Sequence, residues 1–567
     1  MRHTHSVLGG AALIVAGALA LAGCSAAGDD ESQHAAEVKE ADYNPQPREN
    51  LQQGGEVRFA IGDIPPQMND ANSDATASSA TLAAWFRPQV LLMEPDGTPY
   101  KNDAYLDVWE HHEVDGNTQL TFTFTDEAHW NDGTDMDWTA IESTWKTQRS
   151  YDEGFNPNAI DGYQGIKSVE QGETPKTAIV TYDGLFAWPE MPFATLVHPK
   201  AATPEEFNEG FVENPRPELG AGPYAIETFD VQAGLVVLEP NSEWWGAEPL
   251  LDKVTFRQLE STAAINAFKN GEIDGVGTPS QDELSQVADV EDTVTYRAQQ
   301  TANTLLQVNA ERPQFADLEV RKAFFLGINR DQQKQIAWQG LGYDEPDAGS
   351  FILYSFQPDY SDSLAAAGWS HDPDEANSIL DGAGWEAGED GIRTKDGVRF
   401  SGVLPIWGDS STQASLGQGL QASLKEIGFD LEVDVRPAQA FSDDITSKNW
   451  DISSLRFTSS DPFGAAWFCQ LYCSDSGLNL SSTGTDEIDE RIAEEVAAKT
   501  TAEEQTQAAM QLEPEIMAET WGIIPLYNGP SISTVKQGLA NLSPEPYVGL
   551  DLFGVSPVEN VGWEKSN

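Results

Sequence analysis

Three aspartates lie close together between His129 and Thr139, and carboxylates at such spacing can act as paired acids. Asp132, with Asp135 or Asp137, could supply the two carboxyl groups that glycoside hydrolysis requires. The distance between two carboxyl groups across a cleft decides that chemistry, and spacing along the chain does not reveal it. The sequence Asn-Asp-Gly here is also typical of a turn, where aspartate serves backbone geometry. The turn is the favoured interpretation, and no catalytic residue is predicted.

The other side chains that commonly carry chemistry form no recognisable centre. The sequence contains no G-x-S-x-G elbow, no Walker A loop and no H-E-x-x-H motif. His111 and His112 are adjacent and would point apart on a helix or a strand. Cys469 and Cys473 have no histidine nearby to complete a zinc site; a disulfide between them is plausible, and two free buried thiols are the alternative. We predict no metal, no cofactor and no enzymatic activity.

The composition excludes several classes of partner. The chain has 567 residues and a formal net charge of −60, from 32 Lys and Arg against 92 Asp and Glu. This charge argues against nucleic acid, which needs basic grooves, and against docking on anionic lipid. Because the acids are spread along the chain, a solvated surface is favoured over a site for cationic ligands or metal ions.

Hydrophobic periodicity predicts helices and strands in succession. Residues 119–125 alternate between apolar and polar, which indicates a half-buried strand, and residues 400–406 indicate another. Residues 79–93 and 415–426 have helical spacing, and a further helix begins near Trp138 with Thr139 as its N-cap. This succession indicates an α/β architecture, and the length of the body predicts two or three domains.

Leu21-Ala22-Gly23-Cys24 follows a basic start and an apolar run too short to span a bilayer with its flanks. Small residues just before a cysteine resemble the lipobox of bacterial lipoproteins, in which the signal is removed and the cysteine thiol is lipidated. The resemblance implies a signal peptide at 1–23 and a lipidated Cys24, which would hold the protein on the outer face of the cytoplasmic membrane. An ordinary signal peptide with a chance cysteine is the alternative. Residues 24–52 have almost no large apolar side chains and are expected to form a flexible tether.

Short motifs in a consistent order extend through nearly all of the body. Phe122-Thr123-Phe124 is followed by Trp130-Asn131-Asp132-Gly133-Thr134, with Asp135 at the next position. Others include Gly54-Gly55-Glu56-Val57-Arg58, Gly220-Ala221-Gly222-Pro223-Tyr224, Gly271-Glu272-Ile273-Asp274, Val320-Arg321-Lys322-Ala323, Ile328-Asn329-Arg330, Asp372-Pro373 and Ala383-Gly384-Trp385. Together they resemble the extracellular solute-binding proteins of family 5, the receptors of peptide/nickel-type ABC importers. In that family proline is usual where this chain has Asp135.

The resemblance implies a two-lobed periplasmic-binding-protein-like fold (type II, cluster C), with an extra small domain and a ligand cleft between the lobes. It implies a discontinuous first lobe of residues 53–75, 216–302 and 520–567. The small domain would comprise residues 76–215 and the second lobe residues 303–519.

The resemblance also suggests ligand-binding residues. In peptide-binding members an acid just before an Asp-Pro pair anchors the peptide amine, and here the expected position holds Thr458 or Ser460. Asp461 could take that role or could serve an Asp-Pro turn, and Arg456 could meet a carboxylate or phosphate. The remaining candidates are Phe457 beside Arg456, Trp407, which could stack on a ligand or belong to the core, and Tyr527-Asn528 at the hinge side of the cleft.

The function implied is a monomeric lipoprotein that captures oligopeptides or dipeptides by hinge closure. It would deliver them to an ABC permease in the membrane, driven by separate ATPase subunits. Two alternatives remain open: a receptor for another small solute, such as an oligosaccharide or a metal chelate, and an envelope lipoprotein that regulates glycolipid assembly instead of transport.

Overall fold

The computed structural model describes residues 42–94, 98–158, 160, 162–300, 302–458, 468–542 and 557–565. Within these ranges, no helix combines the length and apolar character that crossing a membrane requires. The predicted signal peptide, Cys24 and most of the tether lie outside the described residues, as do Ser460 and Asp461.

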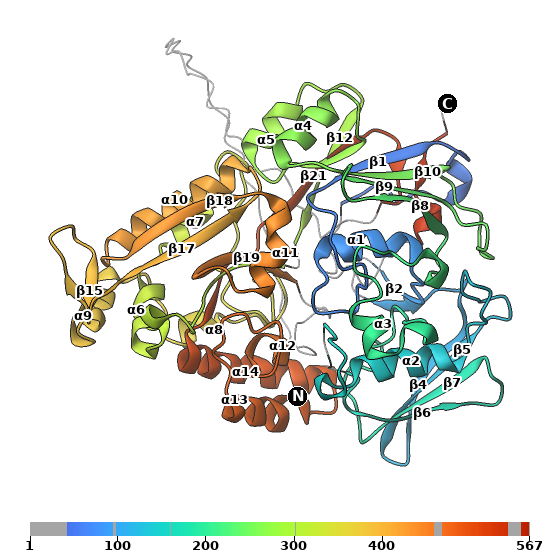
Figure 1. Cartoon of the computed structure of the whole chain (residues 1–567), viewed down its shortest axis with the longest axis horizontal. Helices are drawn as coiled ribbons and strands as arrows, with labels where there is room; N and C mark the ends of the chain where they lie inside the picture. Colours follow the sequence, from blue (N-terminus) through green and yellow to red (C-terminus); the bar gives the residue numbers. More distant parts are fainter. Residues whose placement is uncertain are drawn as a thin grey trace, which may run out of the picture. The chain divides into compact units, whose positions relative to one another are not determined.

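A seven-stranded sheet forms the centre of what we call the first lobe (Figure 1). Strand β1 lies in the middle and pairs in parallel with β10 and β11, while the other pairs are antiparallel. In sheet order the strands are β12 (Thr293–Gln299), β21 (Pro530–Lys536), β11 (Gly275–Gly277), β1 (Glu56–Ile61), β10 (Lys253–Gln258), β9 (Leu235–Pro240) and β8 (Tyr224–Asp230). These strands come from three separate parts of the chain, so the lobe is discontinuous.

Helices pack on this sheet through two apolar clusters. Helix α1 (Ala77–Phe86) places Leu82 and Trp85 against Val57 and Val254. Helices α4 (Ser261–Lys269) and α5 (Gln281–Val287) pack with β11 in a smaller cluster. The predicted helix over 79–93 is therefore too long at its C-terminal end, because α1 stops at Phe86 and β2 (Leu91–Met93) pairs with β3 (Pro99–Lys101).

The Gly-Ala-Gly-Pro-Tyr motif lets the chain entering β8 lie against the end of α1. Gly222 donates its N–H to the carbonyl of Phe86 at 2.9 Å. A Cβ atom at Gly222 would lie 2.7 Å from the Phe86 carbonyl carbon, which is too close for any side chain. Glycine is needed here for this close approach of two backbones.

A four-stranded antiparallel sheet forms the small domain. Its strands in order are β4 (Leu106–Val114), β5 (Asn117–Phe124), β7 (Thr177–Tyr182) and β6 (Ile166–Gln171). Leu120, Phe122 and Phe124 point to the buried face, which confirms the alternation predicted for residues 119–125. Helix α2 (Trp138–Gln148) packs against β6 and β7 of this sheet, and helix α3 (Pro204–Asn208) follows later in the chain.

The second lobe contains three small sheets among its helices. The first has the order β19 (Ile452–Thr458), β13 (Ala302–Val308), β20 (Ile523–Tyr527), and the second is the parallel pair β17 (Ser401–Trp407) and β18 (Asp430–Arg436). The third has the order β14 (Glu386–Ala387), β15 (Arg393–Lys395), β16 (Val398–Arg399). The helices are α6 (Leu318–Leu326), α7 (Arg330–Ala337), α8 (Ser363–Ala366), α9 (Pro373–Gly382), α10 (Ser411–Lys425), α11 (Phe441–Thr446), α12 (Phe468–Tyr472), α13 (Asp486–Arg491) and α14 (Ala502–Thr520). Helix α10 lies along the β17–β18 pair (Figure 1), as expected for a parallel crossover.

The chain crosses between the two lobes twice. It leaves β12 at Gln299 and enters β13 at Ala302; it leaves β20 at Tyr527 and enters β21 at Pro530. The second crossing lies later than the boundary predicted at residue 520. Strand β20 is buried throughout and pairs with β13, so residues 520–527 belong with the second lobe.

Candidate functional site

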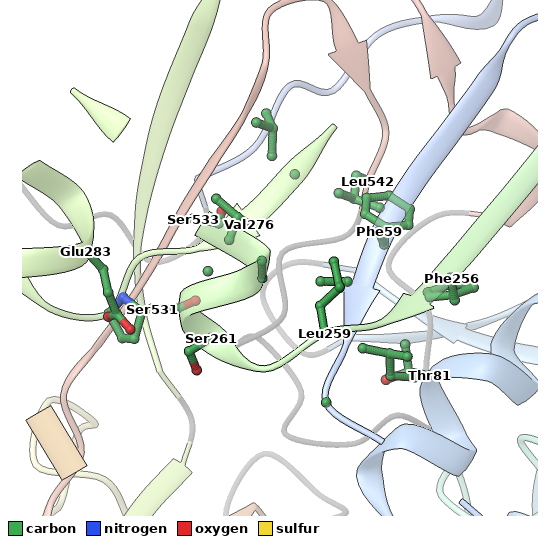
Figure 2. Close-up of a pocket in the computed structure, with 18 of the residues that line it drawn as sticks. Phe59, Thr81, Phe256, Leu259, Ser261, Val276, Glu283, Ser531, Ser533 and Leu542 are labelled. Carbon is green, nitrogen blue, oxygen red and sulfur yellow. The ribbon is translucent and has the colours of Figure 1, made fainter. Parts of the chain in front are cut away.

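A cavity of about 670 Å³ is lined by residues from both lobes, within the range of about 300–1,000 Å³ usual for ligand sites. One wall is the first-lobe sheet, from which Phe59, Val276, Ser531 and Ser533 project (Figure 2). The second lobe contributes Trp407, Gly408 and Ala438. The wall is mainly aromatic and aliphatic, with hydroxyl and carboxyl groups at intervals.

Trp407, the last residue of β17, is held in a defined orientation at this cavity. Its indole N–H donates to Oδ2 of Asp444 at 2.8 Å, and its ring packs edge-on against Phe441 with centroids 5.2 Å apart. Arg436 pairs with the same carboxyl oxygen at 2.8 Å. Burial opposes ionisation of Asp444, but the hydrogen bonds from Arg436 and Trp407 outweigh it and lower the pKa of this carboxyl. The ring of Trp407 therefore lines the cavity in an orientation held by Asp444 and Phe441.

Two hydrogen bonds join the lobes at the cavity. The N–H of Ala438 in the second lobe donates to Oε1 of Glu260 in the first, at 3.1 Å. The N–H of Thr262 in the first lobe donates to Oδ1 of Asp409 in the second, at 3.3 Å. Glu260 stands at the N-cap position of α4, but its side chain makes no capping hydrogen bond. Its carboxylate instead reaches across to the other lobe.

Asn528 ties the two crossings together. Its amide nitrogen donates to the carbonyl of Ala302 at 3.0 Å and to Oδ1 of Asn303 at 2.8 Å. Its amide oxygen accepts from the Ser355 hydroxyl at 3.0 Å. Asn528 is 1% exposed, so these contacts are shielded from water. A side chain that links both crossings of a two-lobed protein is well placed to control the hinge.

The carboxylate of Glu345 holds the backbone of the second crossing. Glu345 accepts from the N–H of Asn528 at 2.7 Å and of Gly529 at 2.9 Å, and from the Tyr343 hydroxyl at 2.6 Å. Burial raises the pKa of Glu345 despite these hydrogen bonds. Gly529 has a φ of 81°, a left-handed conformation that glycine adopts without strain.

The other predicted residues within the described ranges lie next to the crossings and do not line the cavity. Arg456 and Tyr527 are both paired with Thr304 of β13, so the three share one face of the sheet. Tyr527 packs on Trp338 at 5.5 Å, and burial raises its pKa to about 12. Phe457 is paired with Asn303 on the opposite face.

The aspartate cluster of the small domain serves local structure. Oδ1 of Asp132 accepts from the N–H of Thr134 at 2.9 Å, and Oδ2 is paired with Lys200. Asp137, rather than Thr139, is the N-cap of α2, and its Oδ1 accepts from the Thr139 N–H at 2.9 Å. The N-cap prediction was wrong by two residues, because the aspartate carboxylate reaches the free N–H groups of the first turn.

Cys469 in α12 forms a disulfide with Cys473, the residue directly after that helix, with Cα atoms 4.8 Å apart. Within the ranges that the structure describes, no three His, Cys, Asp or Glu side chains gather as ligands for a metal ion.

Comparison with known proteins identifies the family. The model described as bacterial extracellular solute-binding proteins, family 5 Middle, matches residues 104–479. The chain belongs to this family. It is 29% identical over 556 residues to the oligopeptide-binding protein OppA of Mycobacterium tuberculosis, covering 95% of this chain and 92% of OppA. The two-lobed α/β fold predicted from the motifs is thereby confirmed.

Solved structures support the same fold. The periplasmic EDTA-binding protein EppA matches with a TM-score of 0.78 and 23% identity, over 94% of this chain and 100% of that one. The oligopeptide-binding protein AppA of Bacillus subtilis, solved with a nonapeptide, matches with a TM-score of 0.75 and 18% identity, over 91% of this chain and 100% of that one.

Sequence reasoning missed most of the cavity wall. Phe59, Ser531 and Ser533 belong to strands far apart in the chain, and Glu260 looks like an ordinary acid at the start of a helix. The only local signal for Glu260 is its position after a strand, where ligand-binding residues often lie at the edge of a sheet.

Proposed function

We propose that this protein is the substrate-binding component of an ABC importer, and that it captures oligopeptides or dipeptides by closure of its lobes. The observation that carries the proposal is the cavity, which takes its wall from both lobes beside two chain crossings. Contacts made only in the closed form shift the population toward that form when a ligand binds. The closed form then docks on a membrane permease, whose ATPase subunits are separate chains.

Two observations favour peptides over other solutes. The OppA relative and the AppA structure are named for oligopeptides, and AppA was solved with one bound. The EDTA-binding protein EppA would argue for an anionic chelate, but no Lys, Arg or His is among the described residues of the cavity wall. A desolvated polyanion would have no counter-charge there. The engaged aspartates of the small domain support binding without catalysis.

Native mass spectrometry of the full chain, purified in mild detergent, tests this function. We expect a protein monomer carrying a ladder of added masses that fragment as short peptides. A single added mass that does not fragment as a peptide would contradict peptide capture. The expected binding of synthetic peptides would then also be absent when measured by calorimetry.

We further propose that Cys24 is lipidated and holds the protein on the outer face of the cytoplasmic membrane. The support is the apolar run and the small residues before Cys24. Replacing Cys24 with alanine should move the protein from the membrane fraction to the medium or the soluble envelope fraction and abolish incorporation of labelled palmitate. Cys469→Ala is the matched control and should leave both unchanged. Continued incorporation of labelled palmitate into the Cys24→Ala protein would contradict the anchor.

A further inference from the structure

The charged side chains of the cavity wall all have one sign. Among the described residues that line it, the ionisable acids are Asp42, Glu260 and Glu283, and there is no basic side chain. The chain as a whole is acidic, with 92 Asp and Glu against 32 Lys and Arg, and the cavity wall follows that balance. The wall therefore offers counter-charges for a cation and none for an anion.

Two of the three carboxylates are engaged in supporting the backbone. Oε2 of Glu283 accepts from the Ser280 N–H at 3.1 Å and from its hydroxyl at 2.7 Å, which caps α5. Oδ2 of Asp42 accepts from the N–H of Arg297 at 2.9 Å. These contacts satisfy part of the negative charge and fix both side chains.

Glu260 is different, because it lines the cavity and its hydrogen bond within the described structure uses only one of its two carboxylate oxygens. Oε1 accepts from Ala438, as described above. Oε2 lies at Gly408, only 3.1 Å from where a Cβ of that residue would stand. No ion pair of the described residues includes Glu260. A half-buried carboxylate thus stands next to the residue that follows Trp407.

The neighbourhood of Glu260 suits a cation on two counts. An ammonium or guanidinium group can donate a charge-assisted hydrogen bond to Oε2. The same group can lie against the face of Trp407, whose ring is held by Asp444 and Phe441. An acidic ligand group would meet uncompensated negative charge at the same place, which disfavours it.

We infer that the cavity receives the cationic side chain of a Lys or Arg residue of the peptide, with Glu260 as the counter-charge and Trp407 as the stacking surface. This inference rests on the proposed peptide-binding function. Because Glu260 also joins the two lobes through Ala438, a cation that orders this carboxylate favours the closed form. Glu260 would therefore take part both in recognising the ligand charge and in closing the lobes.

Calorimetry on the full chain in mild detergent, at physiological salt, tests the inference. The probes are pentapeptides of alanine and phenylalanine that carry Lys, norleucine or Glu at each position in turn, with free or acetylated N-termini. For wild type we expect at least one cationic form to bind about tenfold more tightly than its neutral counterpart, a difference of about 1.4 kcal/mol. Loss of this preference on the change from Lys to norleucine is the expected result. A preference that depends only on the free N-terminus, and is lost on acetylation alone, would overturn the assignment to a side chain.

Glu260→Gln is the decisive variant, because glutamine keeps an oxygen for the Ala438 N–H and removes the charge. We expect the preference for the cationic peptides to shrink to about twofold or less, while neutral peptides bind as before. Glu239→Gln removes one charge from an exposed site on β9, outside the cavity, and should leave the preference intact. This control separates a local counter-charge from the general attraction of an acidic protein.

The contrary outcomes are distinct. A wild-type protein that binds peptides without regard to charge, or a preference that survives in Glu260→Gln, would overturn the role of Glu260 and leave peptide binding in place. An equal loss of all peptides in Glu260→Gln would also overturn it and reduce Glu260 to a contact between the lobes. A wild-type protein that binds none of the peptides would overturn the proposed function itself.

Discussion

Replacing Glu513 with glutamine should remove a pH dependence of stability that amounts to about 3 kcal/mol. Glu513 is fully buried in α14, where its carboxylate accepts from the Ser350 hydroxyl at 2.6 Å and the Phe351 N–H at 2.8 Å. Burial raises its pKa from 4.5 to about 7. The folded protein therefore holds this proton more tightly than the unfolded chain does, and the free energy of unfolding falls as pH rises from about 4.5 to about 7.

Urea unfolding followed by tryptophan fluorescence at pH 5 and pH 8 measures this effect. As pH rises from 5 to 8, the free energy of unfolding of wild type should fall relative to that of Glu513→Gln. Glutamine carries no titrating proton, so the variant lacks this loss. Glu504→Gln, an exposed change on the same helix, should follow wild type at both. Glu559 is also buried, which raises its pKa to about 7, so some slope will persist in every variant. Parallel curves for wild type and Glu513→Gln would show that Glu513 does not titrate in this range.

Asn528→Asp should lower the free energy of unfolding by about 3 kcal/mol. The new carboxylate has the shape of the amide but cannot donate to the Ala302 carbonyl or to Oδ1 of Asn303. Two buried oxygen acceptors would then lose their donor and lie against a carboxylate oxygen. Because the two crossings would lose their link, we also expect weaker peptide binding. Urea unfolding gives the stability, and calorimetry gives the dissociation constant.

The control for this change is Asn214→Asp, which alters an exposed asparagine in the same chemical way. Its stability should stay within about 0.5 kcal/mol of wild type. If Asn528→Asp were no less stable than this control, the hydrogen bonds at the crossings would not hold the two segments together as the geometry indicates.

Local patterns predicted the elements well where packing agrees with local preference. The strand at residues 119–125 and the helix at 415–426 were recognised because one face of each is consistently apolar. The helix predicted over 79–93 failed at its end, since Leu91–Met93 is apolar on both sides and pairs with β3. An apolar run of that length does not by itself distinguish a helix from a buried strand.

The site was predictable only in part. Trp407 was predicted to stack on a ligand or to belong to the core, and Asn528 was predicted at the hinge side of the cleft. Trp407 lines the cavity, and Asn528 lies at the crossings between the lobes. Arg456, Phe457 and Tyr527 lie beside the crossings, where pairing register decides which face of the sheet each occupies, and their ligand-binding role stays a prediction. The amine-anchoring role of Asp461 stays a prediction, since that residue lies outside the described ranges.

Periodicity and the order of motifs were sufficient to predict the α/β class and the family. Periodicity and motifs involve residues near one another in the chain, so they can be read without knowing the tertiary structure. The cavity wall includes residues of β1, β10, β11 and β21. These strands lie in one sheet, but the chain leaves the first lobe and comes back to it before all four are in place. The contact of Glu260 with Ala438 of the other lobe exists only after both crossings are made, so no local pattern could have revealed it.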